Sequence, residues 1–375
     1  MKTITFLCLS GLFCLHIFAQ TNAFHPGEIW PDDKGVHINA HGGGILYHDG
    51  MYYWYGENKG EHSNNALVGI TCYSSTDLYH WKNEGVVLDV SDDAKSPIAR
   101  GCIMERPKVI YNTTTQKYVL YFHLELLGRG YDAANVGIAV SDFPTGKFKF
   151  LKNARVNPGI FPLDMTVAQK EAKQMPSDFK EWWTPEWRTA IENGLFVRRD
   201  LAGGQMCRDM TLFVDDDGKA YHIYSSEDNL TLQIAALSDD YLNYTGQYVR
   251  VAPGGHNEAP TLFKKDGKYY MITSGCTGWA PNAARLFTAD HIFGPWNELR
   301  NPCVGVGAQL TFHSQGTYIL PVPGKKDAFI FMADRWRPEH PIDGRYIWLP
   351  ILFEKGLPVL KWQDSWGLDF FHVKM

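Results

Sequence analysis

The chain has 375 residues, of which 45% are hydrophobic and 21% charged, so it can bury a large core as one big domain or two smaller ones. Its formal net charge of -5 gives no basic surface, which argues against nucleic acid as a partner. Long charge runs and low-complexity tracts are absent from the sequence.

Residues 1–23 differ from the rest of the chain. Lys2 precedes an apolar stretch from Ile4 to Phe18, and small or polar residues follow up to Ala23. This order is typical of a secretory signal peptide, and the apolar stretch is too short to span a bilayer with its flanks. We therefore expect a secreted or periplasmic protein without membrane insertion.

The remaining residues, 24–375, repeat one pattern five times. Each copy begins at a polar residue, continues as an apolar run, turns, and returns as an aromatic-rich run. Turns such as Asp217-Gly218 and Asp266-Gly267 favour β-hairpins because these residues tolerate positive φ. The five copies begin at His41, Glu105, Asp209, Glu258 and Gln315.

Each copy predicts four antiparallel strands. The first strands are expected at residues 45–47, 109–111, 212–214, 261–263 and 318–322. A second strand follows the turn, a third ends in a Ser or Thr plus Asp corner, and a fourth is irregular. Four-stranded antiparallel units repeated around an axis are the blades of a β-propeller. The sequence therefore predicts an all-β fold, a single five-bladed β-propeller.

The longest interval between copies, from the second to the third, predicts a helical insertion at about residues 153–205. Residues 166–174 and 177–193 have helical patterns, punctuated by Pro176 and Gly194. Trp182, Trp183 and Trp187 cluster there. We favour an interpretation in which these indoles pack the insertion against the blades. The alternative is a flap that shapes subsites for the leaving group.

In a propeller the innermost strand of each blade lines the central channel, so residues at equivalent strand starts converge. His41, Glu105, Asp209, Glu258 and Gln315 are therefore expected to surround one pocket. For any single residue, capping of a strand end is an alternative explanation. Three carboxylates and a carboxamide in register favour a functional site.

Converging carboxylates without metal-ligand spacing suit the hydrolysis of a glycosidic bond. One carboxylic acid protonates the leaving oxygen, and other carboxylates raise the pKa of that acid by charge repulsion. Aromatic faces can hold sugar rings. No cofactor is expected. The sequence does not exclude a structural ion bound in the channel.

These motifs resemble glycoside hydrolase family 43, which consists of five-bladed inverting glycosidases. Glu258-Ala259-Pro260, followed by the strand Gly267 to Tyr270, matches the motif of the family's general acid. Asp209, before the hairpin at Asp215 to Tyr221, matches the aspartate that tunes the pKa of the acid. The resemblance covers essentially the whole chain after the signal peptide.

The first copy departs from the family, since Asn39-Ala40-His41-Gly42-Gly43 replaces the Asp-Pro pair that supplies the general base. This resembles the exo-β-1,3-galactanase branch, as do Tyr53-Trp54-Tyr55-Gly56-Glu57, Glu105-Arg106-Pro107-Lys108 and Ser314-Gln315. The resemblance implies a catalytic Glu105 and a Gln315 that positions the water, with an imidic tautomer as one form. Gln309 is the nearest rival of Gln315.

Further residues are expected to bind the sugar because they follow second strands. They are Glu57, Asp228, Asn229, Thr277 and Trp279, with His41 added from the ring of strand starts. Trp279 is the best stacking platform among them. The alternative for each is an ordinary polar surface loop.

The resulting prediction is an inverting exo-glycosidase that releases galactose from β-1,3-galactan or arabinogalactan side chains of plant-type polysaccharides. An α-L-arabinofuranosidase or β-xylosidase of the same family is the enzymatic alternative, which the missing base aspartate disfavours. A sugar-binding propeller without turnover is the alternative from another class, and the retained proton donor argues against it. A retaining fructan hydrolase would need an early Asp-Pro-Asn motif, which the sequence lacks.

Overall fold

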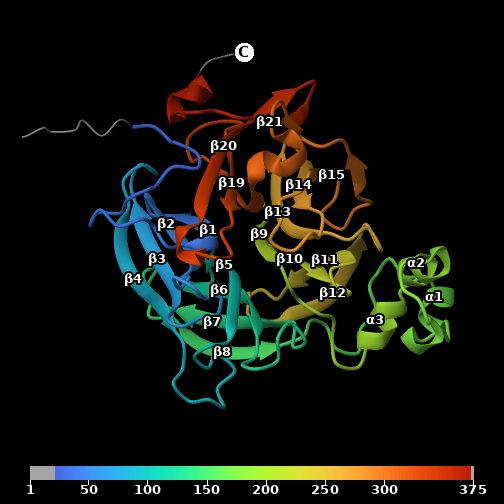
Figure 1. Ribbon diagram of the computed structural model, residues 1–375. Coiled ribbons are helices and arrows are strands. Elements are labelled where there is room, and N and C mark those ends of the chain that lie inside the picture. The colour runs from blue at the N-terminus through green and yellow to red at the C-terminus, as the bar shows by residue number, and fades with distance from the viewer. Residues whose placement is uncertain (1–21, 373–375) are drawn as a thin grey trace, which may run out of the picture.

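A computed structural model describes residues 22–372 and shows five sheets arranged around a central axis (Figure 1). Blade 1 contains β1 (His41–His48), β2 (Met51–Glu57), β3 (Gly69–Ser75) and β4 (Lys82–Asp89). Blade 2 contains β5 (Ile103–Asn112), β6 (Lys117–Glu125), β7 (Asn135–Ser141) and β8 (Lys149–Ala154). Blade 3 contains β9 (Met210–Val214), β10 (Ala220–Ser226), β11 (Thr231–Leu237) and β12 (Tyr244–Val251).

Blade 4 contains β13 (Glu258–Lys265), β14 (Lys268–Ser274), β15 (Ala284–Ala289) and β16 (Asn297–Leu299). Blade 5 contains β18 (Gln315–Pro321), β19 (Phe329–Arg335), β20 (Arg345–Glu354) and β21 (Leu357–Lys361), and the short β17 (Cys303–Val304) joins its outer edge in parallel. Each blade is a meander in which consecutive strands pair antiparallel. The predicted five-bladed propeller is confirmed, with longer strands than the sequence indicated.

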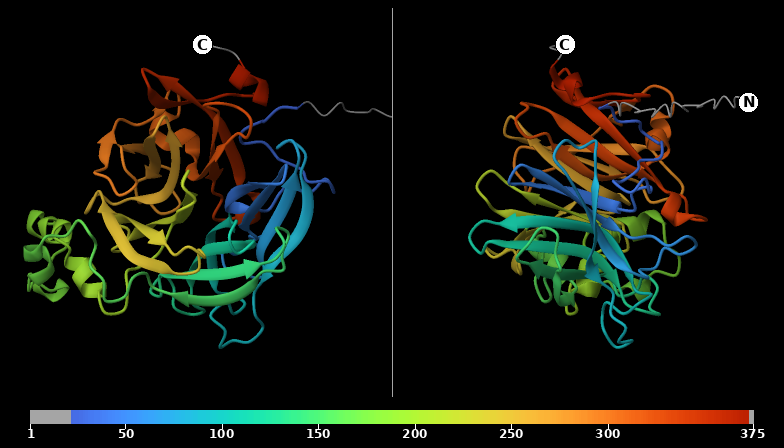
Figure 2. Two further views of the ribbon diagram at one scale, coloured as in Figure 1. Left: turned by 180° about the vertical axis from the view of Figure 1, so that it is seen from behind. Right: turned by 90° about the vertical axis from the view of Figure 1, so that its left-hand side faces the viewer.

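The insertion between blades 2 and 3 lies outside the ring of blades (Figures 1 and 2). It contains α1 (Val167–Glu171), η1 (Pro176–Asp178), α2 (Pro185–Glu192) and α3 (Leu195–Asp200). The insertion follows directly on β8, which ends at Ala154. The predicted helix over residues 177–193 is too long, since α2 begins only after its N-cap Thr184. Gly194, at φ 80°, ends α2 and leads directly into α3, which the sequence did not predict.

A β-bulge interrupts the pairing near the start of four innermost strands, after His41 of β1, Glu105 of β5, Glu258 of β13 and Gly316 of β18. In three of them the next residue has a positive φ: Gly42 at 59°, Arg106 at 55° and Ala259 at 51°. A bulge bends the strand and redirects the side chains beside it. The strand starts that form the pocket therefore do not follow simple strand alternation.

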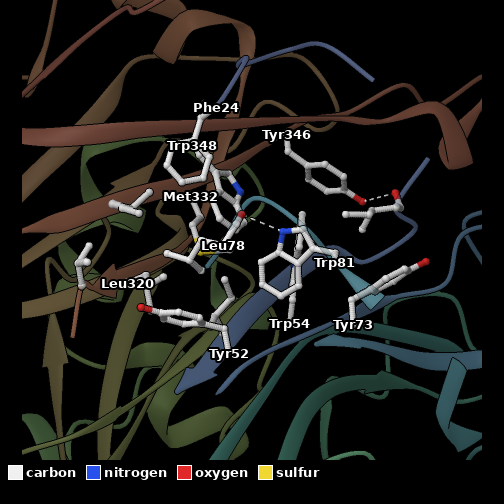
Figure 3. Packing of buried hydrophobic residues seen from close by; sticks show 14 of the residues in the cluster. Phe24, Tyr52, Trp54, Tyr73, Leu78, Trp81, Leu320, Met332, Tyr346 and Trp348 are labelled. Atoms are coloured by element: carbon white, nitrogen blue, oxygen red, sulfur yellow. Dashed lines mark hydrogen bonds between the residues drawn. The ribbon is translucent and has the colours of Figure 1, made fainter. Parts of the chain in front are cut away.

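Blades 1 and 5 close the ring through an aromatic cluster (Figure 3). Trp54, Trp81 and Trp348 are almost completely buried there, so Trp54 faces between blades as strand alternation predicts. The N-terminal segment joins the cluster, because the backbone of Phe24 bonds that of Trp366 at 2.7 and 3.1 Å. The hydroxyl of Tyr346 accepts from the amide of Ala40 (3.0 Å) and donates to the carbonyl of Ile38 (2.7 Å).

The predicted signal peptide lies almost wholly in residues 1–21, outside the described part of the chain. Within residues 22–372 no helix is long and apolar enough to cross a bilayer. The five cysteines of this range are unpaired thiols.

We expect Trp348→Ala to lower the free energy of unfolding by about 3–5 kcal/mol, because it opens a cavity in the cluster that closes the ring. Chemical denaturation followed by circular dichroism measures this loss. Val306→Ala is the control, since Val306 is 97% exposed and its truncation is expected to change stability by at most about 0.5 kcal/mol. A loss below about 1 kcal/mol for Trp348→Ala would show that the ring does not depend on this cluster.

Candidate active site

A cavity of about 260 Å³ opens where the innermost strands begin. Four of the five predicted strand starts line it together, namely Glu105, Asp209, Glu258 and Gln315. The remaining lining residues are Glu57, Lys59, Arg106, His123, Tyr131, Arg208, Asn229, Gly278, Trp279 and Trp336. The cavity is small for a ligand pocket, so it suits one end of a polymeric ligand rather than a long segment of it.

The buried side chain of Arg106 spans the cavity floor and joins three blades. Its Nη2 donates to Oδ2 of Asp209 at 2.7 Å and to Oε1 of Gln315 at 2.5 Å. Its Nη1 donates to the carbonyl of Gly316 at 2.9 Å. Burial opposes its charge, but Asp209 and the neighbouring glutamates raise the pKa of Arg106 above its ordinary value. The guanidinium is therefore a permanent cation between blades 2, 3 and 5.

Glu258 has the properties of a general acid. Burial, followed by the negative charge of Asp209, raises the pKa of Glu258 to about 7. Its Oε1 accepts a hydrogen bond from Nδ2 of Asn229 at 2.8 Å. Asp209 is held in place by the amide of Ala259, which donates to Oδ2 at 3.1 Å. A carboxyl that is still protonated near neutral pH can donate a proton to a leaving group.

Glu105 is in the opposite protonation state. Burial alone would raise the pKa of Glu105, but hydrogen bonds from His123 and Tyr131 and the charge of Lys59 lower it to about 2. The hydroxyl of Tyr131 donates to Oε1 at 2.8 Å, and Nδ1 of His123 lies 3.2 Å from Oε2. Although burial opposes it, the carboxylates of Glu105 and Glu125 raise the pKa of His123 to about 9. Glu105 is thus a carboxylate that faces an imidazolium.

The contacts of Gln315 fix the orientation of its amide. Oε1 accepts from Nη2 of Arg106 and, at 2.9 Å, from Nε1 of Trp336, while Nε2 donates to Oγ of Ser274 at 2.9 Å. Arginine and tryptophan nitrogens only donate here, so Oε1 must be the acceptor. An imidic tautomer would place an O–H proton against these two donors. The structure therefore favours an ordinary amide.

Glu57 and Lys59 form a buried ion pair at the cavity wall. Nζ of Lys59 lies 2.5 Å from Oε2 of Glu57. Oε1 of Glu57 accepts from the backbone amide of Arg106 at 2.9 Å, which stabilises the bulge of β5. Glu57 therefore lines the cavity as predicted.

The side chain of Lys108 lies beneath the cavity, in the channel where the sequence did not exclude a bound ion. Its Nζ donates to the carbonyls of Gly42 (2.8 Å) and Arg106 (3.3 Å). Burial and the charge of Arg106 lower the pKa of Lys108 to about 7.

The expectation that His41 lines the pocket is wrong. Its ring is fully buried behind the cavity, stacks on Tyr346 at 5.3 Å, and lies 3.6 Å from Asp334. Gly42 follows at positive φ, so the bulge turns the strand start away from the channel.

Asp228, Thr277 and Gln309 also lie outside the cavity lining. Asp228 instead pairs with Arg199 of the insertion at 2.5 Å. The hydroxyl of Thr277 holds its own loop by donating to the carbonyl of Ala280 at 2.6 Å. Gln309 is exposed in η2 (Ala308–His313), so Gln315 is the glutamine of the site.

Two indoles form an aromatic wall. Trp279 is 41% exposed and meets Trp336 edge to face at 5.7 Å. Trp279 was predicted, and Trp336 was not. Trp336 directly follows β19, the second strand of blade 5, so the rule that selected residues after second strands could have found it. Other lining residues that the sequence missed are Lys59, Arg106, His123, Tyr131 and Arg208.

Comparison with known proteins identifies the class. Residues 179–328 match the model of glycosyl hydrolases family 43. A GH43 β-1,3-galactosidase solved with galactodeoxynojirimycin is 59% identical, with 92% of this chain and 100% of that chain covered and a TM-score of 0.91. The chain therefore belongs to glycosyl hydrolase family 43, which confirms the resemblance found in the sequence.

More distant structures show the same fold. An exo-β-1,3-galactanase of Phanerochaete chrysosporium with β-1,3-galactotriose is 30% identical, over 92% of this chain and 68% of that chain, with a TM-score of 0.73. An exo-β-1,3-galactanase of Clostridium thermocellum is 32% identical over 92% and 66%, with a TM-score of 0.74. A β-D-galactofuranosidase of Aspergillus niger is 30% identical over 91 residues, which is 24% of this chain and 26% of that protein.

We expect Glu258 to titrate near pH 7 and to remain protonated below that pH. In Asp209→Asn the titration should move to lower pH, because the variant removes a negative charge that raises the pKa of Glu258. ¹³C NMR of protein labelled at the glutamate side-chain carboxyl carbon measures both values, and the signal that Glu258→Gln removes supplies the assignment. A titration of Glu258 near the ordinary value of 4.5 in the unsubstituted protein would contradict the account.

Proposed function

We propose that this protein is an exported exo-β-1,3-galactosidase that releases terminal galactose from β-1,3-galactan with inversion. One observation carries the proposal: one small cavity holds both the carboxyl of Glu258, whose pKa is raised to about 7, and that of Glu105, whose pKa is lowered to about 2. The close likeness to a GH43 β-1,3-galactosidase supports the choice of galactose and of the linkage. The apolar leader of residues 1–23 supports export.

In this mechanism Glu258 donates its proton to the glycosidic oxygen as the bond to the anomeric carbon breaks. Asn229 holds the carboxyl by its hydrogen bond, and Asp209 keeps it protonated until the substrate binds. The negative charge of Glu105 stabilises the oxocarbenium-like transition state. An ionised carboxylate does so strongly once the bound sugar displaces water from the cavity, because the local dielectric is then low.

Water attacks the anomeric carbon from the face opposite the leaving group. The second amide N–H of Gln315 binds this water but cannot take its proton. Because the attacking oxygen becomes strongly acidic as its new bond forms, even a weak base such as Glu105 suffices to accept the proton. Gln315 therefore positions the water. Glu105 acts as the general base, in place of the aspartate that other family members have and this chain lacks.

An arabinofuranosidase or xylosidase is less well supported, because the similar structures named above are β-1,3-galactosidases and exo-β-1,3-galactanases. A sugar-binding propeller without turnover would gain nothing from raising the pKa of Glu258. Perturbed acids of this kind are typical of catalytic sites.

We expect the protein to release galactose from β-1,3-galactan and β-1,3-galactobiose, and Glu258→Gln to lower kcat by about 100-fold or more, because the proton donor is lost. Chromatography of the released galactose measures both rates. Glu354→Gln is the matched control, since Glu354 lies on the hairpin of blade 5, paired with Lys361 and remote from the cavity lining.

The control variant should retain full activity. Binding of galactan without release of galactose, unchanged in Glu258→Gln, would instead identify a sugar-binding protein and refute the proposed activity.

A further inference from the structure

The helical insertion is attached to the rim of blade 3. Arg250 of β12 donates from Nη1 to the carbonyl of Glu192 at 2.8 Å and from Nη2 to that of Ile191 at 2.7 Å. The same guanidinium forms a buried ion pair with Glu227 at 2.7 Å. Leu230 packs into the apolar core of the insertion. The insertion is therefore held at a defined place beside the turn that follows β10.

This turn is bonded to the segment that leads to Glu258. The amide of His256 donates to the carbonyl of Leu230 at 3.1 Å, and the amide of Asn257 donates to the carbonyl of Asn229 at 2.9 Å. Asn229 in turn holds the carboxyl of Glu258. An ordered stretch of rim thus connects the insertion with the proton donor.

Two indoles of the insertion are presented to solvent at this rim. Trp182 is 47% exposed and Trp183 49%, whereas Trp187 between them is buried. Their rings lie 5.4 and 5.0 Å from that of Trp187, and the ring of Trp183 lies 5.1 Å from that of His256. The interpretation that these indoles pack the insertion against the blades holds for Trp187. It accounts only for the buried half of the Trp182 and Trp183 side chains.

Trp183 has a left-handed backbone conformation, with φ at 71°. In this conformation its indole lies half exposed beside the ring of His256.

The position of Glu258 indicates that the polymeric substrate passes this rim. The cavity holds the end of the chain, so the rest of a polymer must lie outside it. In the proposed mechanism the leaving oxygen binds beside Glu258, and the segment from Glu258 back to His256 forms the rim that Trp183 contacts. We take this rim as the path of the remaining polymer. The apolar C–H face of a galactose ring can stack on an indole there.

We propose that Trp183, supported by Trp182, is a distal binding site for galactose units of the polymer beyond the bond that is cleaved. The inference rests on the proposed function and extends it from the cavity to the insertion. It predicts that long substrates gain affinity from a surface that short substrates do not reach.

Trp183→Ala should lower kcat/KM for β-1,3-galactan by about 3- to 10-fold, mainly through KM, as the loss of one aromatic contact predicts. The value for β-1,3-galactobiose should not change, because Trp183 does not line the cavity. Trp183→Tyr should restore most of the activity on the polymer. Trp362→Ala removes another partly exposed indole, on blade 5, and should leave both substrates unaffected.

Equal losses on both substrates, or no loss on either, would overturn the inference while leaving the proposed activity intact. Failure of the unsubstituted protein to release galactose from either substrate would refute the proposed activity instead. In that case affinity electrophoresis in gels that contain β-1,3-galactan still tests the binding site, because it measures binding and not turnover. Retardation that Trp183→Ala abolishes supports the site, and retardation that it leaves unchanged overturns it.

Discussion

The site depends on one buried cation, the guanidinium of Arg106. It bonds Asp209 of the segment before blade 3 and both Gln315 and Gly316 of blade 5, while its own backbone forms the bulge of blade 2. Removing one partner of a buried ion pair leaves the other uncompensated, at a cost of about 3–5 kcal/mol. The positions of Asp209 and of the Gln315 amide are therefore set by the same side chain. The blades are similar, but this contact makes the end of the channel asymmetric.

Glu105 and Glu258 occupy equivalent positions near strand starts, followed by equivalent bulges, but the pKa values of their carboxyls are shifted in opposite directions. Burial raises the pKa of both groups. Opposite Glu105 on the second strand is His123, which together with Lys59 and Tyr131 outweighs burial and lowers the pKa. Opposite Glu258 is Ser274, which carries no charge, and the charge of Asp209 adds to the effect of burial. A repeated fold thus obtains an ionised carboxylate and a protonated acid from one position in its repeat.

The repeat made the fold and most of the ring predictable, because strand starts in a propeller converge whatever their separation in sequence. The repeat could not predict the position of the His41 side chain, since the bulge at Gly42 places that ring behind the cavity. Asp228 follows a second strand like the other predicted ligands, but Arg199 of the insertion pairs with it. Arg106 stands in the motif Glu105-Arg106-Pro107-Lys108, yet its contacts across three blades depend on a backbone conformation that no local sequence pattern indicates.

The most direct test of the mechanism is the anomeric configuration of the first product. ¹H NMR during hydrolysis of long β-1,3-galactan chains, whose leaving group is not free galactose, resolves α- and β-galactose before mutarotation mixes them. The account predicts that α-galactose forms first, because water attacks opposite the leaving group in a single displacement. Initial formation of β-galactose would contradict it, since retention would require a covalent intermediate and a nucleophile in place of the bound water.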